Sequence, residues 1–69
     1  MSNIVDARGL SCPQPVMLVQ KAIAAGELPI VVLVDTATSR ENVRRMAQAK
    51  GLKVEILADS DEFRLVITN

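Results

Sequence analysis

The only cysteine of the chain, Cys12, lies in the short run DARGLSCPQP, which spans residues 6–15. The 69 residues include no histidine, tyrosine or tryptophan, so no other side chain is a nucleophile that ionises near neutral pH. A lone thiol excludes an internal disulfide, a Cys/His hydrolase and a dithiol oxidoreductase, because each needs a second reactive group. Any covalent chemistry of this protein therefore depends on Cys12.

The residues that follow the thiol predict the start of a helix. Because Pro13 disfavours helical backbone at the residue before it, we expect Cys12 at the N-cap and Pro13 as the first helical residue. The helix dipole would then stabilise the thiolate and lower the pKa of Cys12. Pro13 and Pro15 lack an N–H, which leaves Gln14 as the main backbone donor of the first turn. We expect modest activation, helped by Arg8.

The alternative is that Cys12 is a buried structural residue, since a lone cysteine in a small intracellular domain commonly packs as an apolar side chain. The Cys-Pro-x-Pro context favours the reactive thiol, because buried structural cysteines rarely stand at a helix start that prolines define. The sequence thus predicts a thiol that is presented to a partner rather than one driven by a catalytic base.

Composition bounds the class of protein. A chain of this length makes one small domain, which buries only about 60 % of its unfolded surface and depends on good packing. Apolar residues make up 49 % of the chain, and eight basic and eight acidic side chains give a net charge of zero, which does not favour nucleic acid as a partner. The longest apolar stretch, residues 30–34, is too short to span a bilayer. We expect a cytoplasmic monomer with no metal, no cofactor and no membrane contact.

Apolar periodicity predicts six elements in the order βαβαββ. They are a strand at Ile4-Val5, a helix from Pro13 to a stop at Gly26, a central strand over residues 30–34, a helix capped by Thr38 and Glu41 and ended by Gly51, and strands over residues 52–57 and 63–67 joined by an Asp59-Ser60-Asp61 turn. Two crossovers place both helices on one face of a four-stranded mixed sheet. Residues 1–69 are therefore predicted to form a single two-layer α/β sandwich domain.

The buried faces of the two helices follow from the same periodicity. The first helix should bury Val16, Leu18, Val19, Ala22 and Ile23, and the second Val43, Met46 and Ala47. The uncovered sheet face should carry Val31 and Leu33, or the alternate set, together with Val66, and such an exposed apolar patch could contact a partner.

Charged and apolar residues on the outer sides of the helices are candidates for partner docking. Arg40, Arg44 and Arg45 project from the second helix, and Glu41 is expected to pair with Arg45. The alternatives are a solvated helix face and a docking surface for an acidic partner. Met17 falls on the polar side of the first helix, where it is either a partly exposed filler or the rim of an interface.

The pattern Asp6-x-Arg8-Gly9-Leu10-x-Cys12-Pro13-x-Pro15 resembles the signature of the TusA/SirA/YedF family of small sulfur-carrier proteins. The resemblance implies a TusA-like sulfur-carrier domain in which Cys12 accepts sulfur as a persulfide from a cysteine desulfurase and passes it to an acceptor protein. Such a carrier has no independent turnover, because its partners supply the catalytic machinery. The resemblance also implies the supporting residues, which are Asp6, Arg8, Gly9, Pro13, Gln14 and Pro15.

The second half of the chain narrows the resemblance. Many family members place a proline directly after the aspartate that follows the second strand, whereas here Thr36 follows Asp35. Residues 38–43, TSRENV, look like the YedF subgroup, which is associated with selenium metabolism and whose members usually carry a further domain. Two hypotheses result: a sulfur or selenium carrier that uses Cys12, and a binding or regulatory module that acts through the second helix or the open sheet face.

Overall fold

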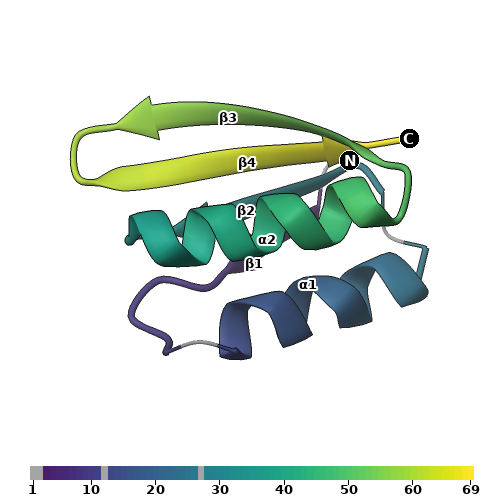
Figure 1. Ribbon diagram of the computed structural model, residues 1–69, viewed down its shortest axis with the longest axis horizontal. Coiled ribbons are helices and arrows are strands. Elements are labelled where there is room, and N and C mark those ends of the chain that lie inside the picture. The colour runs from purple at the N-terminus through teal and green to yellow at the C-terminus, as the bar shows by residue number, and fades with distance from the viewer. Residues whose placement is uncertain (1–2, 12, 27) are drawn as a thin grey trace.

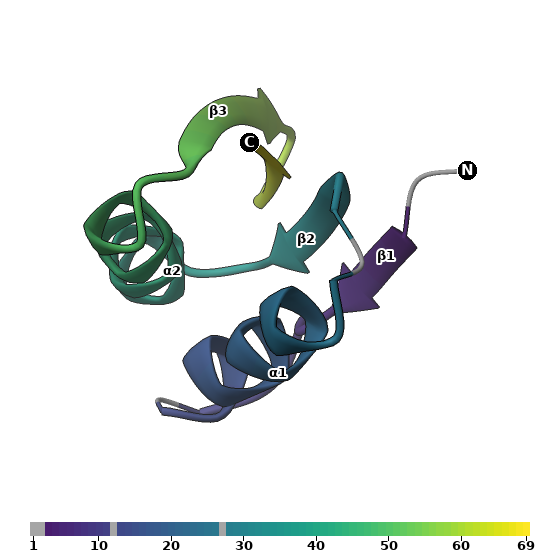
Figure 2. The same ribbon diagram turned by 90° about the vertical axis from the view of Figure 1, so that its right-hand side faces the viewer.

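The chain folds into two layers, a four-stranded sheet and two helices that cover one face of it (Figure 1). The computed structural model describes residues 3–11, 13–26 and 28–69. The elements are β1 (Asn3–Asp6), α1 (Gln14–Ala24), β2 (Ile30–Val34), α2 (Ala37–Ala49), β3 (Lys53–Asp59) and β4 (Glu62–Thr68). Figure 2 shows both helices on the same side of the sheet. The predicted βαβαββ sandwich is confirmed, with element ends that differ by one or two residues.

The sheet has the strand order β1-β2-β4-β3, with β1 parallel to β2 and the other two pairs antiparallel. β2 is central, as its aliphatic sequence predicts, and its residue Val31 lies between Ile4 of β1 and Val66 of β4. β3 and β4 form the predicted hairpin, in which Asp59 pairs with Glu62 across a two-residue turn. The carboxyl end of β2 thus lies beside the first residues of β4, and the carboxyl end of β1 lies on the other side of β2 at the same end of the sheet.

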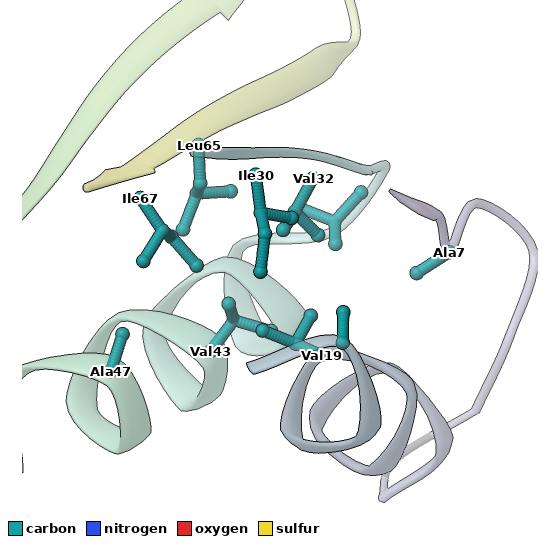
Figure 3. Close-up of a cluster of buried hydrophobic side chains, with 10 residues drawn as sticks. Ala7, Val19, Ile30, Val32, Val43, Ala47, Leu65 and Ile67 are labelled. Carbon is teal, nitrogen blue, oxygen red and sulfur yellow. The ribbon is translucent and has the colours of Figure 1, made fainter. Parts of the chain in front are cut away.

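The core forms between the sheet and the helices. Alternate residues of β2, namely Ile30, Val32 and Val34, are fully buried. Figure 3 shows side chains of α1 and α2 pointing toward those of the sheet. The other buried apolar residues are Ala7, Val19, Ala22, Val43, Ala47, Leu65 and Ile67. Each large aliphatic side chain in this set contributes about 1.5–3 kcal/mol of transfer free energy, so a chain whose single cysteine cannot form an internal disulfide depends on them.

The buried side of α1 differs from the prediction at Leu18, which is exposed, and at Pro15, which was not predicted to be buried. Pro15, Val19 and Ala22 are buried, whereas Leu18 is 38 % exposed. Residues 15, 19 and 22 lie along one line of the helix surface, and position 18 is rotated away from that line. Leu18 therefore belongs to the outer surface of the domain.

Among the described residues, neither helix has the length and apolar character that a membrane span requires.

The two ends of α2 are fixed by different local signals. At its carboxyl end, Gly51 has a φ of +80°, and the N–H groups of Gly51 and Leu52 bond to the carbonyls of Gln48 and Ala47. This is a Schellman motif, in which glycine is favoured because the position needs left-handed backbone. The prediction that Gly51 ends the helix is confirmed.

At its amino end, α2 is capped by Thr36 and not by Thr38 as predicted. The Thr36 hydroxyl accepts a hydrogen bond from the Ser39 N–H at 3.1 Å, and Thr36 itself has extended backbone angles. Thr38 lies inside the first turn, and the Glu41 side chain bonds to arginines of the same helix instead of reaching back to the cap. The prediction failed because each threonine has a suitable capping partner three residues later, Ser39 for Thr36 and Glu41 for Thr38.

The cap assignment can be tested by comparing the two threonines. Thr36→Ala should lower the free energy of unfolding by about 1 kcal/mol, because the Ser39 N–H loses its acceptor. Thr38→Ala is the matched control and should change it by less than about 0.5 kcal/mol. Urea denaturation followed by circular dichroism measures both, and an equal loss in the two variants would contradict the assignment.

Candidate functional site

The segment between β1 and α1, which holds the predicted thiol site, begins at the carboxyl ends of the parallel strands. Ala7, directly after β1, is 1 % exposed, and its N–H donates to the Leu33 carbonyl of β2 at 2.8 Å. In Figure 1 this segment lies toward the same end of the molecule as the β3–β4 turn and the start of α2. Residues far apart in the sequence can therefore contact it.

Arg8 connects β1 to β4. Its Nε and Nη2 atoms donate to the two carboxylate oxygens of Asp6 at 2.9 and 2.8 Å, and its Nη1 donates to the Glu62 carboxylate at 3.1 Å. The bidentate geometry toward Asp6 is the strongest arrangement available to an arginine and a carboxylate. Glu62, the first residue of β4, was not predicted as a site residue. The only sequence signal for it is its place after the turn, since its contact depends on the strand order.

This network changes the electrostatics predicted for the thiol segment. The hydrogen bonds from the Arg8 side chain and backbone N–H lower the pKa of Asp6 from 3.8 to about 2. Asp6 and Glu62 in turn raise the pKa of Arg8. Two carboxylates compensate the one guanidinium, so the expected help from Arg8 in activating the thiol is not supported.

Gly9 turns the chain away from β1. Its φ of +76° lies in the left-handed region, which explains why glycine stands here. Its N–H donates to the Oδ2 atom of Asp35 at 3.0 Å, and Asp35 directly follows β2. The next residue, Leu10, is half-buried and packs against the core. Asp35 is thus a second contact of this segment that the sequence prediction did not assign to the site.

The start of α1 is displaced by one residue from the prediction. Pro13, with φ of −99° and ψ of 19°, occupies the N-cap position predicted for Cys12, and Gln14 is the first helical residue. The Gln14 N–H donates to the Ser11 carbonyl at 2.8 Å, which closes a tight turn before the helix. Gln14 is therefore not the free donor that we expected. Pro15 is the second helical residue and is buried.

Cys12 lies outside the described residues, so its exposure and its pKa remain predictions. The structure describes the chain on both sides of it, and both sides are held by hydrogen bonds, through Gly9 and Ser11 before it and Gln14 after it. Of the predicted supporting residues, Asp6 and Arg8 join Glu62 in one ion-pair network, and Gly9 bonds separately to Asp35. Pro13, Gln14 and Pro15 form the start of the helix.

The candidate docking residues occupy two separate surfaces. Met17 is 56 % exposed and lines a shallow groove of about 330 Å³ on α1. The other residues of this groove, which we call the α1 groove, are Leu10, Gln14, Leu18 and Lys21. None of the three arginines of α2 lines it. The α1 groove is therefore the docking candidate closest in sequence to the thiol.

The arginines of α2 form a different ion-pair pattern from the predicted one. Glu41 bonds to Arg44 at 2.6 Å and to Arg40 at 3.2 Å, and the pair lowers the pKa of Glu41 and raises that of Arg44. Arg40 also stacks on Phe63, with its guanidinium 4.7 Å from the ring centre. Arg45 is exposed and makes no ion pair with the described residues. The predicted Glu41–Arg45 pair is wrong, because the side chain at i+3 meets the carboxylate first.

The uncovered sheet face carries the residues that the sequence analysis gave as its first alternative. Val31 and Leu33 are half-buried there, and Val66 lies beside them. The lining of this face also includes Arg64 and the exposed side chains of Ile4 and Leu57, which are 67 % and 44 % exposed.

Within residues 3–11, 13–26 and 28–69, no group of three acidic, cysteine or histidine side chains could hold a metal ion.

Comparison with known proteins places this fold and site in a family. Residues 3–69 match the sequence model of the sulfurtransferase TusA family. The chain is also similar to a solved SirA-like protein from Desulfitobacterium hafniense, with 35 % identity over 97 % of this chain and 95 % of that one, and a TM-score of 0.85. The protein therefore belongs to the TusA family of sulfurtransferases. Membership supports a role as a sulfur carrier that relays sulfur between proteins.

The Asp6–Arg8 pair predicts a specific pH dependence of stability. Because the folded-state pKa of Asp6, about 2, lies below the ordinary 3.8, its ionised form stabilises the fold above 3.8, and this contribution is lost as the pH falls from 3.8 to about 2. Asp6→Asn should remove this part of the acid-induced decrease in the urea midpoint. Arg8→Gln should remove the larger share of this part, because only the backbone N–H of residue 8 would still donate to Asp6, and the double variant should remove no more than Asp6→Asn. Additive losses would contradict the pair.

Proposed function

We propose that Cys12 accepts sulfur as a persulfide from a donor of the cysteine desulfurase type and relays it to an acceptor protein. The observation that carries this proposal is the whole-chain match to the TusA family in a chain that has a single thiol. The held segments on either side of Cys12 support it, because a carrier thiol must be offered to its partners in a defined orientation.

The transfer step conserves electrons and needs no external oxidant. The Cys12 thiolate attacks the terminal sulfur of the donor persulfide, a new sulfur–sulfur bond forms, and the donor cysteine leaves as a thiolate. Repetition of the same exchange, with an acceptor thiol or another nucleophile attacking the terminal sulfur on Cys12, regenerates the free thiol. The thiolate fraction and the leaving group set the rate of such exchanges.

The chain itself offers little to activate the thiol, which supports a carrier rather than an independent enzyme. It has no histidine to act as a base. The two local groups expected to favour the thiolate are committed elsewhere, the Gln14 N–H to Ser11 and the Arg8 guanidinium to Asp6 and Glu62. The proton of Cys12 must then be taken by solvent or by the partner enzyme.

We propose further that the α1 groove is the partner-docking surface. Its exposed Met17 and Leu18 provide apolar contact area, and Lys21 provides a cation for an acidic group on the partner.

The finer assignment to selenium metabolism rests on residues 38–43 and their likeness to the YedF subgroup. We also propose that the protein acts in the cytoplasm as a monomer of this one domain.

Persulfide formation is testable by intact-protein mass spectrometry. After incubation with a cysteine desulfurase and cysteine, the protein should gain one sulfur atom that a reductant removes, and Cys12→Ser should gain none. Alkylation of wild-type Cys12 under native conditions is the control that the thiol is accessible. An accessible thiol that gains no sulfur from any desulfurase tested would contradict the proposal.

The second candidate function is a binding module that acts through α2. Arg45 favours it, because it is exposed and forms no ion pair with any described residue. Met17→Asp and Arg45→Glu separate the two docking surfaces. If the α1 groove docks the donor, Met17→Asp should raise the KM for sulfur transfer about tenfold, because it places a charge in an apolar contact, and Arg45→Glu should change it less than about twofold. The reverse pattern would assign docking to α2.

A further inference from the structure

We propose that Asp35 is a positioning residue for the segment that carries the thiol. The inference rests on the proposed function, since it assigns to Asp35 a role in sulfur transfer by Cys12. The observation behind it is the hydrogen bond from the Gly9 N–H to Asp35 Oδ2 at 3.0 Å, between residues 26 positions apart in the sequence.

Asp35 stands on a rigid support. It directly follows β2, whose alternate residues Ile30, Val32 and Val34 are fully buried and which pairs with a strand on each side. The Thr36 cap fixes the chain immediately after it, where α2 begins. The position of the Asp35 carboxylate therefore follows from the central strand, and not from the segment that it contacts.

The contact to Asp35 acts at the point where the segment leaves the sheet. Ala7 is still tied to the sheet through its hydrogen bond to Leu33, and Arg8 is tied through Asp6 and Glu62. Gly9 comes three residues before Cys12 and has the positive φ that redirects the chain. Among the described residues 9–11, the other backbone anchor is the Ser11 carbonyl, which belongs to the turn before α1. Asp35 thus makes the last hydrogen bond from the sheet to residues 9–11, and Leu10 adds only apolar packing.

A backbone N–H bonded to a carboxylate is a charge-assisted contact, which is stronger than a neutral one. Its loss would leave Gly9, a residue with large conformational freedom, free to sample other backbone angles. Transfer between two thiols requires the sulfur atoms to meet within a narrow range of orientations, so added freedom lowers the productive fraction of encounters. The expected effect is a slower transfer with an unchanged intrinsic thiol reactivity.

The test compares Asp35→Ala, Asp35→Asn and Asp61→Ala. Asparagine keeps a side-chain oxygen acceptor at the same place, so it should retain part of the hydrogen bond. Asp61 is exposed on the β3–β4 turn and forms no hydrogen bond to residues 7–11 in the described part of the chain, so Asp61→Ala is matched in charge. Three quantities are measured: the amide exchange rate of Gly9 by NMR, the rate of sulfur transfer from a cysteine desulfurase, and the rate of Cys12 alkylation by iodoacetamide.

We expect Asp35→Ala to speed Gly9 exchange and to slow sulfur transfer about fivefold, while alkylation changes less than about twofold. Asp35→Asn should recover most of the transfer rate, and Asp61→Ala should match the wild type. Unchanged Gly9 exchange in Asp35→Ala would overturn the proposal, as would alkylation that falls as far as transfer. If the wild type gains no sulfur at all, the proposed function fails, and Gly9 exchange still decides whether Asp35 holds the segment.

Discussion

The burial of alternate β2 side chains is the constraint on which the rest of this small domain depends. Ile30, Val32 and Val34 bury one face of β2 beneath the helix layer, and the two neighbouring strands then fix the register of β2. The carbonyl of Leu33 and the carboxylate of Asp35 consequently stand at a defined edge of the sheet. Both accept hydrogen bonds from the segment that follows β1. The packing of the core therefore determines the geometry of the candidate site more than contacts within that segment do.

The charges around this segment serve structure more than catalysis. Arg8 has the position expected of an activating cation, yet its donors face Asp6 and Glu62, and it ties two strands together. An unpaired cation next to the thiol would raise the thiolate fraction, but nucleophilicity falls as the thiol pKa falls. A carrier must both accept and release sulfur, so strong stabilisation of its thiolate is no general advantage. The observed compensation of Arg8 fits that balance.

Most of the fold could be predicted from the sequence because its signals are local. The aliphatic run of β2, the turn before Glu62 and the glycine after α2 each specify a structure within a few residues. The errors arose where the structure depends on contacts in space, or where two nearby residues could each play the same role. Two threonines competed for the α2 cap, and Leu18 differs from Val19 by one step around the helix. Periodicity alone could not choose between them.

The candidate site was predictable in part for the same reason. The residues in the run from Asp6 to Pro15 were found because they are contiguous, whereas Glu62 and Asp35 reach this run only through the strand order β1-β2-β4-β3. The sequence pattern predicts the strands and the β3–β4 hairpin. It does not predict whether β3 or β4 lies beside β2. Contacts from β2, from the residue directly after β2 and from β4 converge on a segment of three residues, 7–9. A domain with no histidine, and with no metal-binding group of three side chains among its described residues, can still contribute to sulfur transfer in this way, because orientation of one thiol is itself a source of rate.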